Sequence, residues 1–164
     1  MMAAWAKAAE VTEHHKALEP FAGTFDAQLT MWMDPNMPPT VSTGTMTNSW
    51  ILGGRFLEHS YEGEVMGEKF QGRGLWGFDV AANRYNGLWI DNMSTALSVS
   101  TGPLSEDGKT FHMKMTGTDP MTGEAKVTEE LLVLESADRH RMEMFEVHDG
   151  QRVRTMEIVY TRKR

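Results

Sequence analysis

A set of polar and aromatic side chains in this sequence has the types and the spacing to form a binding site. They fall at alternate positions of segments rich in apolar residues, and a period of two places side chains on one face of a β-strand. Aromatic and thioether groups with a few convergent polar groups are the usual lining of a small-molecule pocket. We therefore predict an interior ligand site formed by His59, Tyr61, Trp76, Trp89, Asp91, Met113, Glu146, Arg154 and Tyr160.

Strand parity is what assigns these side chains to the interior. Counting alternate residues places Glu146 on the same inward face as Met144, and Arg154 on the same inward face as Met156. A slip of one residue would reverse the faces of a whole strand. Asp91 and Arg154 would also be satisfied as a buried ion pair that binds no ligand, because buried charges must be paired. Both interpretations place these two side chains inside the fold.

Methionine is abundant, with 14 residues, whereas cysteine is absent. Three Met-x-Met pairs would each present two thioethers on one strand face, an arrangement that suits a soft ion such as Cu(I). Methionine also fills irregular apolar interiors and forms adaptable pocket walls. We favour that second interpretation and predict no metal site for the pairs Met31/Met33, Met113/Met115 and Met142/Met144.

Enzyme motifs are not found in this sequence. It contains no Gly-x-Ser-x-Gly, no His-Glu-x-x-His and no phosphate-binding glycine loop. The run Gly72-Arg73-Gly74-Leu75-Trp76-Gly77 fits Gly-x-Gly-x-x-Gly by letter but lacks the strand–turn–helix context. We interpret it as a strand whose small residues permit bending or close approach. A catalytic alternative would use Asp91, Glu146 or a histidine as general base.

The elements that would position these side chains are one helix and many short strands. Residues 3–18 favour a helix, which Pro20 ends. After Gly23 the period changes to two, and turn residues recur at short intervals. The expected strands are 25–33, 41–52, 55–66, 69–79, 84–93, 95–101, 110–117, 124–135, 139–148 and 152–162.

Strands with short connections and no helix between them indicate an antiparallel meander, and closure of such a sheet removes both exposed edges. We predict an all-β, ten-stranded antiparallel up-and-down barrel with a short N-terminal helix; a β-sandwich is the alternative. The chain is then a single domain over 1–164, with a helical segment at 1–20 and the barrel at 23–162. A barrel of this size is wide enough to hold a cavity.

Composition restricts the partners of this domain. A net charge of −7 argues against nucleic acid, whose binding depends on basic groups. No window approaches the roughly 18 apolar residues of a membrane span. The N-terminus lacks a basic segment followed by an apolar run, so a cytoplasmic location is expected. The expected partner is a small hydrophobic or amphipathic molecule, bound by a monomer or a homodimer.

Several motifs resemble known families. The segment Leu18–Phe25 resembles the helix-then-Gly-x-Trp opening of calycin barrels, the lipocalin and fatty-acid-binding group, with Phe25 in place of tryptophan. From about Leu18 to the C-terminus the chain more closely resembles the bacterial domain-of-unknown-function family 1579. That resemblance implies a calycin-like barrel and no established activity. It rests on the runs Met31–Pro35, Trp50–Leu57, Trp89–Thr95, Asp119–Gly123 and Met156–Arg162.

The calycin resemblance also implies two kinds of ligand. Fatty-acid-binding proteins hold a carboxylate with an Arg and a Tyr two residues apart, and Arg154 and Tyr160 loosely resemble that pair at a wider spacing. The nitrobindin barrels bind haem through a histidine near the C-terminal strand, where this chain has Met156–Tyr160 and no histidine. His59 or His148 is the alternative haem ligand in this chain, but no cofactor is expected.

Three functions remain as hypotheses. The first is a barrel that binds a small apolar or amphipathic molecule without catalysis. The second is an enzyme with a carboxylate or histidine base in the lumen. The third is a structural or interaction protein with a solid core, filled by Trp76, Trp89 and the methionines.

Overall fold

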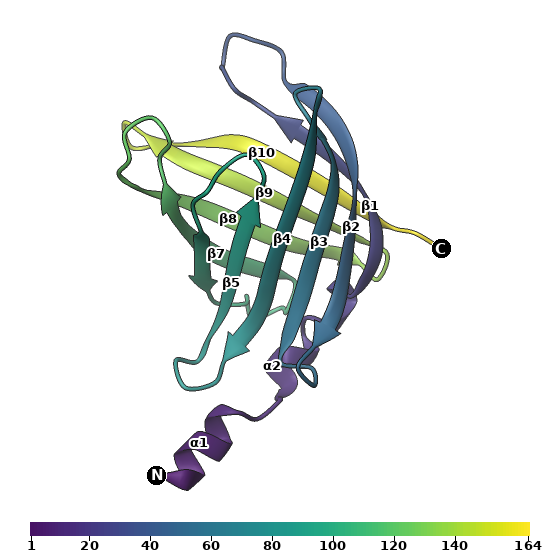
Figure 1. Ribbon diagram of the computed structural model, residues 1–164, viewed down its shortest axis with the longest axis vertical. Coiled ribbons are helices and arrows are strands. Elements are labelled where there is room, and N and C mark those ends of the chain that lie inside the picture. Colours follow the sequence, from purple (N-terminus) through teal and green to yellow (C-terminus); the bar gives the residue numbers. More distant parts are fainter.

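A computed structural model describes residues 1–164 and shows a closed barrel of ten antiparallel strands (Figure 1). Each strand pairs with its neighbours in sequence, and β1 pairs with β10 to close the sheet. This confirms the predicted up-and-down barrel, and no expected strand boundary is displaced by more than three residues. The strands are β1 (Gly23–Met31), β2 (Thr40–Ile51), β3 (Phe56–Val65), β4 (Glu68–Asp79), β5 (Arg84–Asp91), β6 (Ser98–Gly102), β7 (Thr110–Thr118), β8 (Ala125–Ser136), β9 (Arg139–His148) and β10 (Gln151–Arg162).

Tight turns explain why consecutive strands pair. At the β9–β10 turn Asp149 and Gly150 have φ of 50° and 77°, and at the β3–β4 turn Met66 and Gly67 have φ of 54° and 82°. Positive φ at both central residues matches the twist of two-residue hairpins. The Asp-Gly turn was readable from the sequence, whereas Met66 adopts this conformation despite its side chain.

The N-terminal segment differs from the single helix predicted over residues 3–18. It forms α1 (Met2–Ala8), α2 (Glu13–Lys16) and the 3₁₀-helix η1 (Glu19–Phe21). Thr12 starts α2 as a cap: its hydroxyl accepts from the His14 N–H at 3.3 Å, and its own N–H donates to His15 Nδ1 at 3.0 Å. The cap requires extended backbone at Thr12, which separates the two helices. Neither helix has the length and apolarity needed to cross a bilayer.

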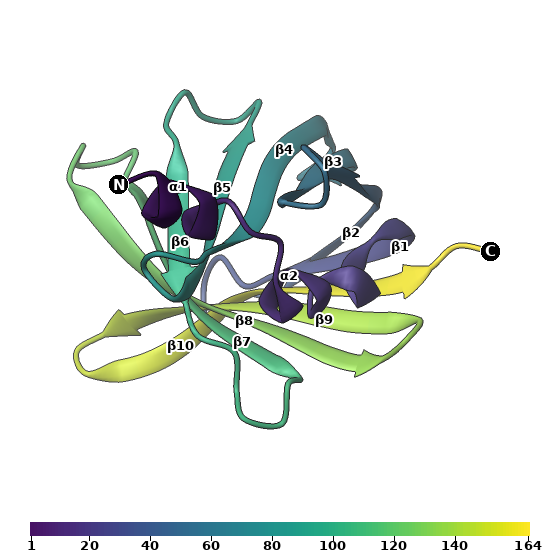
Figure 2. The ribbon, with the colours of Figure 1, turned by 90° about the horizontal axis from the view of Figure 1, so that it is seen from below.

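The segment from α2 to η1 closes one end of the barrel, whereas α1 extends away from it (Figures 1 and 2). No residue of α1 is buried. Leu18 and Phe21 are buried in the barrel, where they form part of an apolar cluster. The other members of that cluster are Leu57, Trp76, Tyr85, Phe111 and Met113.

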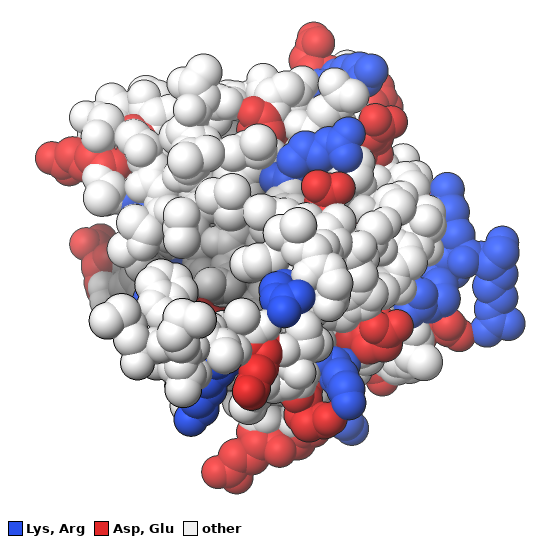
Figure 3. Space-filling model, turned by 60° about the horizontal axis from the view of Figure 1, so that its bottom comes forward, with Lys and Arg blue, Asp and Glu red and all other residues white.

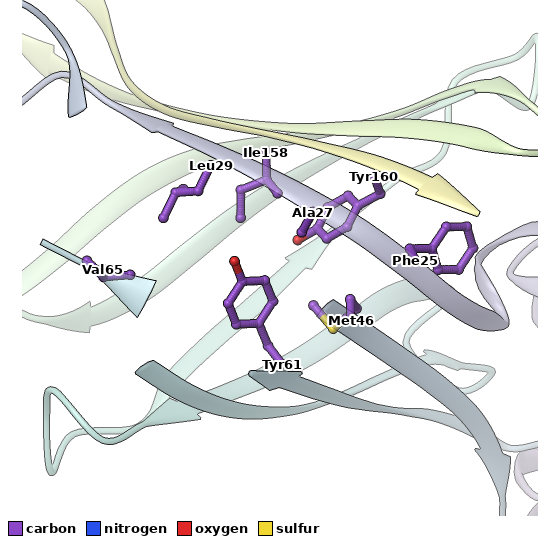
Figure 4. Close-up of a cluster of buried hydrophobic side chains, with 8 residues drawn as sticks. All are labelled: Phe25, Ala27, Leu29, Met46, Tyr61, Val65, Ile158 and Tyr160. Atoms are coloured by element: carbon purple, nitrogen blue, oxygen red, sulfur yellow. The ribbon is translucent and has the colours of Figure 1, made fainter. Parts of the chain in front are cut away.

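A second apolar cluster lies further along the barrel axis, beside the seam where β1 meets β10 (Figure 4). Its side chains come from β1, β2, β3 and β10, so it ties the first strands to the last. It consists of Phe25, Ala27, Leu29, Met46, Tyr61, Val65, Ile158 and Tyr160. The two clusters together stabilise the barrel wall around an interior space.

Candidate functional site: the barrel lumen

The lumen contains a cavity of about 460 Å³. Thirty residues line it, of which 22 are hydrophobic, so its wall is predominantly apolar. At the end opposite α2 the lining includes Met33, Met66 and Met93, which are 64%, 62% and 59% exposed. At the other end Phe21 belongs to the lining and is 1% exposed. The cavity is therefore closed by the N-terminal segment and reaches the surface at a rim of methionines.

Most of the predicted site residues line this cavity. Glu146 and Arg154 are not among the lining residues. The predicted residues that do line it are His59, Tyr61, Trp76, Trp89, Asp91, Met113 and Tyr160. Their role in binding a ligand stays a prediction.

The prediction that Arg154 points inward is wrong. The pairing of β10 with β9 shifts register between Arg154 and Met156, so Thr155 is an extra residue in the ladder. Such a bulge reverses the parity of the residues before it. Arg154 Nη1 consequently donates to Glu143 Oε2 and Glu157 Oε2, both at 3.0 Å, and its guanidinium lies over the ring of Trp32. A buried Asp91–Arg154 ion pair does not form, and Arg154 cannot hold a carboxylate in the lumen.

Glu146 fails as a lining residue for a different reason. It keeps the parity of Met144 but lies near the C-terminal end of β9, beyond the cavity. Its carboxylate is 2.7 Å from Lys126 Nζ and 3.0 Å from His148 Nε2. Strand parity gives the face of a residue, but not whether the cavity extends along the strand as far as that residue.

Trp89 lies flat against two glycines of the neighbouring strand. A Cβ at Gly72 would overlap the Trp89 indole, and a Cβ at Gly74 would lie 3.0 Å from Trp89 Cε3. Trp89 Nε1 donates to Asp91 Oδ2 at 3.0 Å, while Asp91 Oδ1 accepts from the Met93 N–H at 2.9 Å. The run that resembles a nucleotide-binding loop by letter is thus a strand that permits close approach, as predicted.

His59 is held in one tautomer by Asn48. The Asn48 amide nitrogen donates to the Phe21 carbonyl at 2.8 Å, so the Asn48 Oδ1, 2.6 Å from His59 Nδ1, accepts from the histidine. His59 therefore carries its proton on Nδ1 and leaves Nε2 as an acceptor. Burial lowers the pKa of His59 to about 4, so the ring is neutral at neutral pH.

His140 is a second neutral histidine of the lumen. Its ring stacks on Tyr160 at 4.6 Å, and Phe21 and Phe25 contact it edge-on. The pKa of His140 is lowered to about 3, mainly by burial and to a smaller extent by the positive charge of Arg162. Its Nδ1 is buried and makes no hydrogen bond.

Glu130 is an ionisable lining residue that the sequence analysis did not indicate. It lies on β8 opposite Met113 of β7 and Met144 of β9, so thioethers flank its carboxyl group. Burial raises the pKa of Glu130 to about 7, and no cation pairs with it. Parity was ambiguous here because the run that follows, Leu131–Leu134, is apolar on both faces. No signal in the sequence alone identifies it, because its position opposite Met113 is visible only in the folded sheet.

Further polar atoms of the lumen are without partners. The buried Tyr61 Oη and Trp76 Nε1 make no hydrogen bond. Burial raises the pKa of Tyr61. Burial is also the main cause of the raised pKa of Tyr160, and the nearby Tyr61 and Glu130 raise it further. Figure 4 shows the Tyr61 and Tyr160 rings projecting from opposite walls of the same cluster. Tyr61 Oη and Trp76 Nε1 are both enclosed by the protein, so they are unsatisfied polar groups of the wall and not contact points for a ligand.

Methionine forms a large part of the wall. The three Met-x-Met pairs all line the cavity, so the two thioethers of each pair share one strand face, as predicted. Flexible thioether side chains can repack around ligands of different shape. The lining methionines are Met31, Met33, Met46, Met66, Met93, Met113, Met115, Met142, Met144 and Met156.

The nitrobindin resemblance raises the question of haem. The inward residues of the C-terminal strand are Met156, Ile158 and Tyr160, none of which supplies an imidazole. The residues present at that place therefore do not fit a histidine-ligated haem.

A sequence profile for the family described as "Protein of unknown function (DUF1579)" matches residues 10–162. This chain belongs to the DUF1579 family. The match covers α2, η1 and all ten strands, and it confirms the resemblance seen in the sequence motifs. A comparison with curated proteins found no match for this DUF1579 member.

The DUF1579 barrel is similar to the crystal structure of Rv2717c from M. tuberculosis. The two share 12% sequence identity with a TM-score of 0.69, over 94% of this chain and 100% of that one. At this identity the similarity shows a common fold and nothing about function.

Proposed function

We propose that this DUF1579 protein binds a small apolar or amphipathic molecule inside its barrel and catalyses no reaction on it. The observation that carries the proposal is the lumen: a cavity open at one rim and lined mainly by apolar side chains. The few polar side chains that line it include His59, Asp91 and Glu130.

The size of the cavity supports this proposal. Ligand pockets commonly enclose about 300–1,000 Å³, and the lumen at about 460 Å³ falls within that range. A space of this size argues against the solid-core alternative, in which Trp76, Trp89 and the methionines would fill the barrel. The calycin resemblance points the same way, as an argument from fold analogy.

The catalytic alternative depends on Glu130. Asp91 already accepts hydrogen bonds from Trp89 and Met93, and Glu146 is ion-paired outside the cavity. Glu130 has a pKa of about 7 and faces open space, which is how a general base is often placed. Turnover of any substrate that disappears in Glu130→Gln would favour catalysis over simple binding.

Native mass spectrometry of freshly purified protein, together with titration of the neutral dye N-phenylnaphthylamine, tests the proposal. We expect either a co-purified mass or saturable dye binding at one site. Trp89→Leu should weaken dye binding about tenfold, because it removes a large part of the aromatic wall. Arg154→Ala is the matched control and should leave affinity unchanged, since Arg154 lies on the outer face. Absence of any bound mass and of dye binding would refute the proposal.

A further inference from the structure

The ionisable groups of the lumen include acids and neutral bases but no permanent cation. None of the 16 Lys and Arg residues lines the cavity. Figure 3 shows basic side chains at the molecular surface, intermixed with acidic ones. The carboxyl groups that do line the cavity are Asp91 and Glu130.

The histidines do not supply positive charge. His59 has a pKa of about 4 and His140 of about 3, so both rings are neutral at physiological pH. His59 Nε2, left as an acceptor by the Asn48 bond, faces the same interior. A ligand carboxylate would therefore enter a space that offers carboxyl groups and acceptors, with no counter-charge.

Glu130 is a carboxyl group of the cavity wall that has no cationic side chain beside it. Met113 and Met144 flank it, and Tyr61 and Tyr160 share its region of the lumen. A buried carboxylate is tolerated when a cation pairs with it. Without such a cation burial raises the pKa of the carboxyl group to about 7, so a large fraction of it is protonated at neutral pH.

We propose that the lumen selects amphipathic amines: the ligand's ammonium group pairs with Glu130, and its apolar body lies along the methionine and aromatic wall. This inference rests on the proposed binding function and specifies its ligand class. The Trp76 and Trp89 rings strengthen the selection, because aromatic faces attract cations.

Amine binding by this mechanism is linked to pH. An alkylammonium, like the lysine side chain with a pKa of about 10.4, stays charged at neutral pH, while Glu130 loses its proton to solvent when the pair forms. Affinity for the amine should then rise between about pH 6 and pH 8 as this proton becomes easier to remove. On the strands beside β8, Lys114 and Glu143 point outward. The other titratable groups of the lumen are His59, Tyr61, Asp91, His140 and Tyr160.

Three probes of equal chain length test this inference: dodecylamine, dodecanol and dodecanoate, each displacing N-phenylnaphthylamine below its micelle concentration. We expect the amine to bind at least about tenfold more tightly than the alcohol at about pH 8, with dodecanoate weakest. In Glu130→Gln the amine should lose this advantage, while alcohol affinity is retained. Glu129→Gln is the matched control, because the neighbouring Glu129 points outward and pairs with Arg152. It should behave as wild type.

The outcomes separate the two proposals. Equal affinity for amine and alcohol, or tighter binding of dodecanoate, overturns the inference and leaves the binding function standing. An amine preference that survives in Glu130→Gln with native circular dichroism also overturns it. If neither the dye nor any probe binds wild-type protein, both proposals fail.

Discussion

In the folded protein Glu130 holds its proton more tightly than in the unfolded chain, since burial raises its pKa from 4.5 to about 7. Between pH 4.5 and pH 7 the folded state therefore binds more protons than the unfolded state. The stability contributed by Glu130 is present at low pH and is lost as the pH rises through this range. His59 and His140 act in the opposite direction. Their lowered pKa values mean that the unfolded state binds more protons below pH 6.5, so stability falls as pH drops towards 4.

Glu130→Gln should remove the first of these effects. We compare the free energy of unfolding of the variant with that of wild type at pH 8 and at pH 5. The difference should favour the variant by about 1–3 kcal/mol more at pH 8, because a buried glutamine carries no charge at either pH. Urea unfolding at the two pH values measures the difference. Glu129→Gln, on the solvent side of the same strand, should show no such difference. An identical effect of Glu130→Gln at both pH values would mean that Glu130 is not desolvated.

Alternation of side chains was sufficient to predict most of the lining residues, because strand parity is a local property. It failed at Arg154, since the bulge at Thr155 depends on how β10 pairs with β9 and has no mark in the local sequence. It missed Glu130 because a strand apolar on both faces has no readable parity. Both errors concern contacts between strands, which a single sequence does not show.

At the scale of elements, β4 and β5 form one unit of the wall. Gly72 and Gly74 replace side chains on the inner face of β4, and the Trp89 indole of β5 occupies the space they leave. This arrangement brings a large ring flat against the sheet, so the lumen stays open where Trp89 would otherwise project into it. The glycines were read correctly from the sequence as sites of close approach, but their partner could only be seen in the fold.

Gly72→Ala should displace Trp89. Overpacking of this kind typically costs about 1–3 kcal/mol, and the shifted ring should also reduce dye affinity and change tryptophan fluorescence. Arg73→Ala, between the two glycines but exposed, is the control and should leave all three unchanged. Urea unfolding, dye titration and emission spectra give the readouts. A Gly72→Ala variant with native fluorescence and affinity would show that the indole does not depend on this glycine.

The N-terminal segment also departs from its local sequence preference. Helix propensity over residues 3–18 is continuous, yet the chain breaks at Thr12 because its cap and the burial of Leu18 and Phe21 set the direction of α2 and η1. Tertiary burial overrides propensity in such cases. The closure of the barrel end is therefore a property of the whole fold and not of the helix.

For the whole molecule, stability depends on the seam where the first strand meets the last. Arg162, at the end of β10, joins three segments there. Its Nη1 donates to the Ala22 carbonyl at 2.7 Å, and its Nη2 donates to the Pro20 and Ala137 carbonyls at 2.8 and 3.0 Å. Its guanidinium also lies over the Phe25 ring. One side chain thus links η1, the β8–β9 turn and the closing strand pair.

Arg162→Met should lower the free energy of unfolding by about 2–4 kcal/mol, because it leaves these carbonyls without their charged donor. Arg164→Met, at an 85% exposed side chain that pairs with Asp138, should change it by less than about 0.5 kcal/mol. Because every strand of a closed barrel depends on its two neighbours, the weakened seam should still unfold together with the rest. Urea transitions followed by tryptophan fluorescence and by far-ultraviolet circular dichroism should therefore coincide at a lower midpoint. Separate transitions would show instead that the seam opens independently of the tryptophan-rich wall.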